Sequence, residues 1–190
     1  MRYPEDQKAR TRQRILDEAA RAFRREGIGA TGLQPLMKQL GLTHGGFYAH
    51  FSSKEELVAL ALQQIGQQWH DRLEQETEPP CSQPLIEHYL SEHHRDTPEE
   101  GCPLPGLCYE LSQRGRSSPE TDRLVRHWLE RLDSRMAGQD DSGGQAVLML
   151  SAMTGALLIS RCVTDRHLSD RILAITRQAL LAMASTPGPE

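Results

Sequence analysis

Several residues of this 190-residue chain carry side chains that could react with a ligand or a substrate. Cys102 stands between Gly101 and Pro103, a setting in which it could be the N-cap of a helix. The helix dipole would then lower the pKa of the thiol and favour the reactive thiolate. A cysteine is equally common in protein cores, where it behaves as a small apolar side chain. Two interpretations of Cys102 therefore stay open, a reactive sensor thiol and a buried core residue.

Histidines invite a metal hypothesis, and the densest group is His93-His94 with Glu92 and Asp96. Adjacent side chains on a helix point about 100° apart, so the two imidazoles do not easily share one ion. The cysteines show no CxxC motif and no Cys/His spacing of a structural zinc site. We expect neither a metal nor another cofactor.

The stretch from Gly41 to Glu55 reads GLTHGGFYAHFSSKE and holds three of the few aromatic side chains, Phe47, Tyr48 and Phe51. Its adjacent glycines should weaken a helix by about 1 kcal/mol each relative to alanine. Phe47 and Phe51 are four residues apart and are expected to face a core. The polar side chains between them are left for a partner.

The basic residues are concentrated in the same part of the chain. Residues 1–54 carry ten Lys or Arg and five Asp or Glu, a net charge of +5, and the remainder has twelve Arg against 21 acids, a net charge of −9. A basic head on an acidic body indicates that only the head meets a polyanion.

The elements that position these residues are predicted to be helices, because Leu and Ala dominate while Val, Ile, Thr and aromatic residues are sparse. An all-α protein is expected. A first helix lies within residues 11–30 and ends at Gly27. A capping box at residues 31–34 opens a second helix, and Thr43 caps a third that ends near Phe51. A tight turn at Gly41 joins the last two as a helix-turn-helix.

A second capping box, Ser52 to Glu55, opens a fourth helix that runs toward Leu73 and connects the head, residues 1–54, to a helical body, residues 55–190. Further helices are predicted at about 83–95, 103–114, 118–136, 143–164 and 168–184.

The last two predicted helices are more apolar than a single small domain can easily cover. We therefore expect a homodimer in which they pack across a two-fold axis as a four-helix interface. The alternative is that both fill the core of one chain. The expected interface residues are Leu150, Met153, Leu157, Ile172, Ile175 and Ala179.

The ordered pattern TRQRILDEAARAFRREG followed by LQPLMKQLGLTHGGFYAHFSSKEELV resembles the TetR family of bacterial repressors over about the first 60 residues. The resemblance implies a DNA-binding head and a body that dimerises and binds a small effector. It further implies a homodimer that represses transcription from a pseudo-palindromic operator until the effector changes the spacing of the heads.

On this interpretation the third helix reads DNA, and Gly45 and Gly46 let its backbone approach the major groove. The helix lacks Arg and Lys, so base reading falls to few groups, with His44 donating to guanine. By resemblance, Tyr48 and Lys54 bind phosphates. The expected DNA-binding residues are Thr31, Thr43, His44, Gly45, Gly46, Tyr48, His50 and Lys54. His50 is alternatively a core histidine, and Lys8, Arg10, Arg12 and Arg14 are candidates for backbone or minor-groove contacts.

The effector is expected in an apolar cavity between helices of the body. Its expected lining is Tyr89, Cys102, Leu107, Leu111, Trp128 and Met149. The segment GCPLPGLCYELS at 101–112 is similar to a motif of one TetR-type branch in which some regulators sense oxidants or electrophiles through the cysteine. A thiol sensor that uses Cys102 is therefore the alternative function.

Two other function classes fit the sequence less well. A thiol-dependent hydrolase would need a fixed base partner for Cys102 and would leave the basic head unexplained, so no enzyme activity is expected. A helical adaptor for another protein would have no salt-sensitive affinity for DNA. No stretch approaches the roughly 20 apolar residues that span a bilayer, so no membrane contact and a cytoplasmic location are expected.

Overall fold

The computed structural model describes residues 5–75, 83–113, 115, 117–135 and 142–185, and its regular elements within these ranges are all helical. The all-α prediction is therefore confirmed. The elements are α1 (Glu5–Glu26), α2 (Leu33–Gln39), the 3-10 helix η1 (His44–Ala49), α3 (Lys54–Gln75), α4 (Gln83–Tyr89), α5 (Glu92–Asp96), α6 (Leu104–Gln113), α7 (Pro119–Arg135), α8 (Ser142–Cys162) and α9 (Arg166–Ser185).

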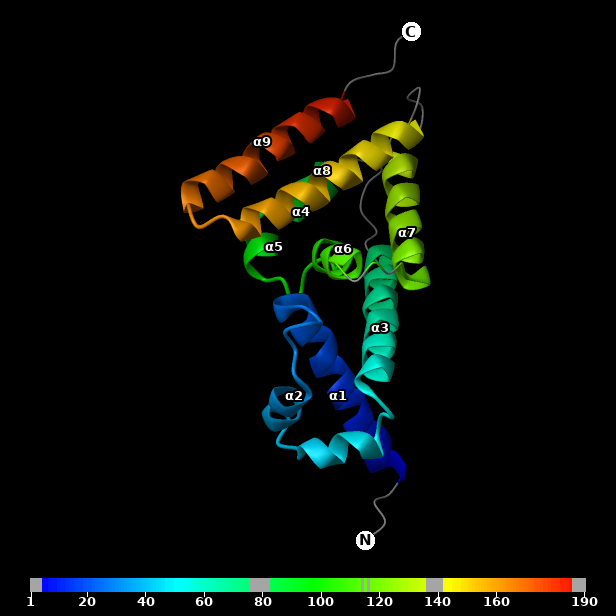
Figure 1. Cartoon of the computed structure of the whole chain (residues 1–190). Coiled ribbons are helices and arrows are strands. Elements are labelled where there is room, and N and C mark those ends of the chain that lie inside the picture. Colours follow the sequence, from blue (N-terminus) through cyan, green and yellow to red (C-terminus); the bar gives the residue numbers. More distant parts are fainter. Residues whose placement is uncertain (1–4, 76–82, 114, 116, 136–141, 186–190) are drawn as a thin grey trace.

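The helices form a small head and a larger body (Figure 1). α1, α2 and η1 make the head at one end, and α8 and α9 pack side by side at the other end. The long helix α3 leaves the head and continues beside α7. Because α3 packs against both α1 and α7, it belongs to both parts. The division into residues 1–54 and 55–190 stays a prediction.

Glycines at positive φ end the first two helices, as the sequence predicted. Gly27 has φ 88° and Gly41 has φ 71°. After α2, the N–H of Leu42 donates to the carbonyl of Met37 at 2.9 Å, and the N–H of Gly41 donates to that of Lys38 at 3.0 Å. This pair of bonds is a Schellman motif. It forms the tight turn that sets η1 against α2.

Both predicted capping boxes need correction. α2 has Gly32 as its N-cap, and the hydroxyl of Thr31 instead donates to the carbonyl of Gly27 at 2.8 Å. At the start of α3 the N-cap is Ser53, one residue later than predicted, and the second bond of a capping box goes to Ser52 instead of the N-cap. The Ser53 hydroxyl accepts from the N–H of Glu56 at 3.1 Å, while the Glu56 carboxylate accepts from the N–H of Ser52 at 2.7 Å.

The body helices lie close to their predicted positions, with one difference. The segment predicted as a single helix at 83–95 is two helices, because α4 ends at Tyr89 and α5 begins at Glu92. Between them the Ser91 hydroxyl accepts from the N–H of His94 at 3.1 Å and caps α5. This local bond competes with continuation of the helix.

Half of the predicted interface is instead core. Leu150, Met153 and Leu157 are 7%, 0% and 0% exposed, so they pack within the chain and the prediction for them is wrong. On α9, Ile175 is 53% exposed, Ala179 is exposed and Ile172 is half-buried. The error is one of helix face, because α8 exposes Leu148 and Ile159 instead.

The exposed apolar residues follow two heptad-like stripes with alternating spacings of four and three. Each position in the stripes is exposed or half-buried. The α8 stripe consists of Leu148, Ala152, Gly155, Ile159 and Cys162, and the α9 stripe of Leu168, Ile172, Ile175, Ala179 and Ala182. Such spacing is that of helices that pack against a partner.

By length and composition, residues 143–162 of α8 are apolar enough to cross a membrane, which corrects the expectation that no stretch is. A core helix of a soluble protein passes the same test. α8 packs against α7 and α9. Its apolar character therefore has an explanation in core packing and in the exposed stripe.

Candidate functional site

The exposed surface of η1 is built on one buried aromatic anchor. Phe47 is 0% exposed and stacks on Phe51 with ring centroids 5.4 Å apart, which confirms their predicted core role. Thr43 caps η1 as predicted, because its hydroxyl accepts from the N–H of Gly46 at 3.2 Å. η1 is a 3-10 helix of six residues, shorter than the predicted helix to Phe51.

Two polar side chains project outward from this anchor. Tyr48 is 59% exposed, His44 is exposed, and their rings meet edge to face at 5.9 Å. Tyr48 also contacts Phe47 edge to face, at 5.2 Å. The phenol and the imidazole are therefore held as one outward-facing pair on a rigid base.

The two glycines of η1 differ in the space that an added side chain would find. A Cβ added at Gly45 would meet nothing within 4 Å, and one at Gly46 would meet only the Thr43 hydroxyl, at 3.2 Å. Neither residue has a positive φ. Packing within the chain and backbone conformation therefore do not require glycine at position 45, and the backbone there is open to close approach from outside.

Beside η1 lies a hollow of about 680 Å³ between η1, α2 and the first half of α1. Lys8 and Arg14 give it positive charge, and Gln7 and Thr11 add polar groups. Basic and polar groups of this kind bind a phosphate of a nucleic-acid backbone. Gln7 and Thr11 were not predicted, although the helical spacing from Gln7 through Thr11 to Arg14 could have indicated them.

His50 forms part of the wall of this hollow. It is half-buried, and its Nδ1 atom is buried without a hydrogen-bond partner among the described residues. Desolvation by burial, with the charges of Lys8 and Arg12, lowers the pKa of His50. The ring is therefore neither fully exposed nor capped on a backbone group, as its core interpretation would require.

Lys54 is already bound within the head. Its ammonium donates to the carbonyl of Thr31 at 2.6 Å and to that of Ile28 at 3.2 Å. Lys54 therefore ties the start of α3 to the loop between α1 and α2, a structural role that was not predicted. An ammonium has three donors, so one N–H is left for a phosphate.

Two other predicted DNA contacts fare differently. Thr31 is 4% exposed and its hydroxyl is used within the chain, so its prediction as a contact is not supported by its position. The guanidinium of Arg12 lies 4.7 Å from the centroid of the Phe51 ring and 3.6 Å from the Glu56 carboxylate. Arg12 therefore helps to hold the head together, whereas Lys8 and Arg10 are exposed.

The predicted effector pocket is packed core. Tyr89, Trp128 and Met149 are 2%, 1% and 0% exposed, and the rings of Tyr89 and Trp128 meet edge to face at 5.4 Å. Leu107 is buried and Leu111 is half-buried. These side chains fill the space that they were expected to line.

Cys102 is the second correction in the body. It is 2% exposed, and burial raises the pKa of its thiol to about 11. Its backbone N–H donates to Nε2 of His94 at 2.8 Å, and Nδ1 of His94 lies 2.7 Å from the carbonyl of Tyr89. Of the two interpretations of Cys102, the structure supports the buried core residue and not the sensor thiol with a lowered pKa, because desolvation dominates.

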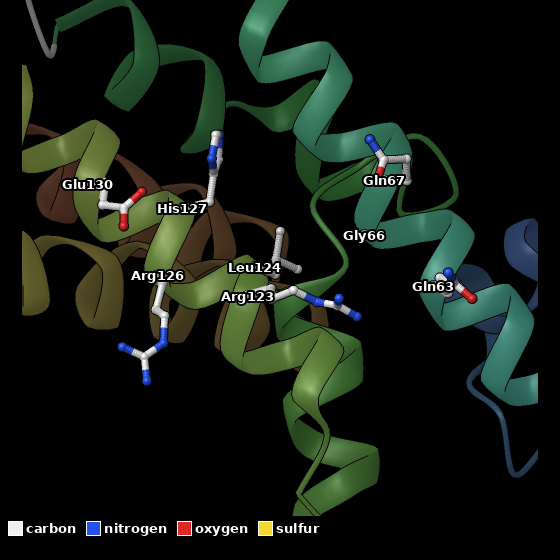
Figure 2. A pocket seen from close by; sticks show the side chains of 8 residues that line it. All are labelled: Gln63, Gly66, Gln67, Arg123, Leu124, Arg126, His127 and Glu130. Carbon is white, nitrogen blue, oxygen red and sulfur yellow. The ribbon is translucent and has the colours of Figure 1, made fainter.

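A different cavity lies between α3 and α7, with a volume of about 410 Å³ (Figure 2). Within the described part of the chain, no group of three or more His, Cys, Asp and Glu side chains is placed to hold a metal. The cavity is lined by Gln63, Gly66, Gln67, Arg123, Leu124, Arg126, His127 and Glu130. Its charged and amide groups suit a polar ligand, and none of its residues was predicted.

Comparison with known proteins relates the head of this chain to one family. Residues 15–61 match the family model of bacterial regulatory proteins of the tetR family. The chain is similar to the HTH-type transcriptional regulator TtgR of Pseudomonas putida, with 33% identity over 78 residues. That match covers 41% of this chain and 37% of TtgR, little more than a third of the relative's length.

Two weaker likenesses extend over most of the chain. It is 22% identical over 184 residues to the HTH-type transcriptional repressor DhaR of Mycobacterium sp. (strain GP1), covering 90% of this chain and 92% of DhaR. The fold is similar to that of a TetR transcriptional regulator from Chloroflexus aurantiacus J-10-FL, with a TM-score of 0.77 and 20% identity over 96% of this chain and 98% of that one. Residues 15–61 therefore match the tetR family of bacterial regulatory proteins, and the fold of the whole chain is similar to that of TetR regulators.

Proposed function

We propose that this protein is a DNA-binding transcriptional repressor that occupies a pseudo-palindromic operator as a homodimer and is released by a small effector. The observation that carries the proposal is the surface of η1. His44 and Tyr48 are exposed above the buried ring of Phe47. Gly45 lies beside them, and the fold has room for a side chain at that position. Such a surface suits the close approach of a backbone to DNA.

Each group of this surface has a proposed role. His44 donates to the edge of a guanine in the major groove, and Gly45 and Gly46 leave room for the groove wall or a thymine methyl. The phenol of Tyr48 and the remaining N–H of Lys54 bind phosphates. A further phosphate enters the hollow between α1 and η1, beside Lys8 and His50.

The two stripes on α8 and α9 support the homodimer. Burying exposed Leu and Ile side chains is favourable by about 1.5–3 kcal/mol for each side chain that becomes fully buried. A two-fold arrangement would place one head on each half-site, with the half-sites separated by about 34–36 Å or a multiple of it. A protein of this kind acts on DNA in the cytoplasm and needs no membrane contact.

Contacts between the body and the head offer a route for effector action. The carboxylate of Glu110 on α6 accepts from the backbone N–H of Gly29 at 3.1 Å. A Cβ at Gly27 would lie 2.5 Å from that carboxylate, so the loop and α6 are closely apposed. Lys54 holds the same loop from α3. We infer that a shift of α3 or α6 on effector binding reorients the head.

The thiol-sensor alternative loses its physical support. A thiol whose pKa is raised to about 11 is almost wholly protonated at neutral pH, and the thiolate is the reacting form. Cys102 is also out of reach of solvent. The same facts argue against a cysteine-dependent hydrolase, and the family consists of regulators. No enzyme activity is part of the proposal.

A binding titration tests the proposed function. Fluorescence anisotropy would follow a labelled duplex from the DNA upstream of the protein's own reading frame, with a scrambled duplex of equal length as control. We expect binding that is at least about 10³-fold tighter than to the control. The affinity should fall by about 10³-fold or more between 50 and 200 mM salt. Equal, salt-insensitive binding to both duplexes would contradict the proposal and favour a protein-binding adaptor.

A further inference from the structure

Gly66 is the unusual residue of the cavity between α3 and α7. It lies in the interior of α3, where glycine destabilises a helix relative to alanine. A Cβ added there would meet nothing within 4 Å, and its φ is not positive. Neither packing nor backbone conformation therefore requires glycine. Its effect is to leave the wall of the cavity open.

The groups around this opening have the chemistry to bind an anion that also forms hydrogen bonds. Figure 2 shows Arg123 extending from α7 toward α3, with Gln67 on the facing helix. A guanidinium binds a carboxylate through two parallel hydrogen bonds, and a glutamine amide both donates and accepts. Glu130, near the same cavity, can accept from a hydroxyl group. Leu124 is the one buried apolar side chain of the lining.

We propose that this cavity binds a small polyhydroxylated or hydroxy carboxylic acid. Its carboxylate pairs with Arg123, and its hydroxyl groups bond to the amides of Gln63 and Gln67 and to Glu130. The volume of about 410 Å³ lies within the range of about 300–1,000 Å³ typical of small-molecule sites. A lining dominated by polar groups does not suit a purely apolar ligand.

Occupancy of this cavity would act on the head through α3, an inference that rests on the proposed function. Gly66 and Lys54 belong to the same helix and are twelve residues, or about 18 Å, apart along its axis. Lys54 holds the loop between α1 and α2. A ligand that draws α3 toward α7 therefore displaces a group that is fixed to the head.

The chain carries its own probe of the cavity. Its two tryptophans are Trp69, one turn beyond Gly66, and Trp128, adjacent to His127, and their rings are 6.3 Å apart. All the tryptophan fluorescence therefore comes from a pair beside the cavity. The measurement needs no DNA, so it stands independently of the proposed function.

The test titrates the full chain with lactate, malate, citrate and gluconate at constant ionic strength, with glycerol and sorbitol as neutral counterparts. We expect a saturable fluorescence change with at least one acid and none with the neutral compounds. Arg123→Gln should weaken that binding by about tenfold or more, because a charged hydrogen-bonded pair is lost. Arg21→Gln, an exposed arginine on α1, is the matched control and should bind normally.

Gly66→Ala is a second variant, and it is expected to fold because the added methyl group meets nothing within 4 Å. It should raise the unfolding temperature by about 2–4 °C, because alanine favours a helix, and it should weaken binding of the acid, because its methyl group enters the cavity. No response to any acid, or unchanged binding by both Arg123→Gln and Gly66→Ala, would overturn the proposal. If an acid binds as expected but leaves DNA affinity unchanged, the cavity proposal stands and its role as the effector site fails. If DNA binding is absent altogether, the proposed function fails separately.

Discussion

The ammonium of Lys54 donates to the carbonyl oxygen of Thr31 at 2.6 Å, across a sequence separation of 23 residues. A second bond, to Ile28 at 3.2 Å, fixes the same loop. The start of α3 is thereby joined to the loop that precedes α2. A residue expected only to bind phosphate therefore also maintains the geometry of the head.

Replacing Lys54 should consequently reduce stability as well as DNA affinity. Lys54→Met removes both bonds while keeping a similar length, and we expect a loss of about 2 kcal/mol in the free energy of unfolding. Urea denaturation measures this change. Lys38→Met, at an exposed position on α2, is the control and should unfold like the unmodified protein. Unchanged stability of Lys54→Met would show that the two bonds contribute nothing to the folded head.

Substitutions of His44 and Tyr48, the exposed pair on η1, should affect base recognition and phosphate binding separately. His44→Ala should reduce discrimination at one base pair of each half-site by about 1 kcal/mol, because one base-edge contact is lost. Tyr48→Phe should instead weaken all duplexes by a similar factor, since only a phosphate contact is removed. Anisotropy titrations against a set of single-base operator variants distinguish these patterns. The opposite assignment of the two effects would refute the proposed roles.

The apolar stripes should control the oligomeric state. Ile159→Glu and Ile175→Glu each place a charge on an exposed residue, 52% and 53% accessible in the single chain. Because the charge would be buried and unpaired in a dimer, both variants should be monomeric but folded. Sedimentation velocity gives the molecular mass, and circular dichroism checks the fold. A dimeric Ile175→Glu would exclude the α9 stripe as interface.

Two further substitutions separate an interface effect from loss of folding. Leu157→Glu buries a charge in the core of the chain, where the side chain is 0% exposed, and should prevent folding. Gln68→Glu adds the same charge to an exposed position on α3 and should leave the dimer intact.

His94 should make the fold sensitive to acid. Burial lowers the pKa of its imidazole to about 4, below the ordinary value of 6.5. The geometry acts in the same direction as burial, because Nε2 already accepts from the N–H of Cys102 and cannot be protonated without losing that bond. Because the pKa of His94 is lower in the folded than in the unfolded chain, its neutral form stabilises the fold. This contribution to the free energy of unfolding is complete above about pH 6.5. That contribution declines as the pH falls from 6.5 toward 4.

The expected loss is on the order of 3 kcal/mol by about pH 4. Urea midpoints between about pH 7 and 4 measure it, and His94→Gln should be less stable at neutral pH but less dependent on pH. His44→Gln, at an exposed position, should keep the pH dependence of the unmodified protein. An equal pH dependence in His94→Gln would contradict the assignment.

Local signals in the sequence predicted the head better than the body. Gly27 and Gly41 mark helix ends because only glycine readily adopts their positive φ, and Phe47 marks the core because it is four residues from Phe51, with which it stacks. The N-cap of α3 was predicted one residue early because Ser52 and Ser53 carry the same side chain, so the sequence alone does not distinguish them.

In the body, hydrophobic periodicity alone did not predict which helix faces are buried. α8 is apolar on nearly every side, so periodicity alone could not tell that Leu157 faces the core and Ile159 the surface. That choice depends on where α7 and α9 pack. The cavity between α3 and α7 was missed for a similar reason, since Gly66 and Arg123 meet only when two distant helices are placed side by side.

The most direct test of the DNA-binding surface is the operator affinity of Gly45→Ala, measured alongside its thermal unfolding. Because an added Cβ meets nothing within 4 Å in the free protein, the variant should be as stable as the unmodified chain or more so. The same methyl group would collide with DNA that approaches the backbone of η1, so the affinity should fall by about tenfold or more. Unchanged affinity in a stable Gly45→Ala protein would contradict the proposal that this face of η1 enters the major groove.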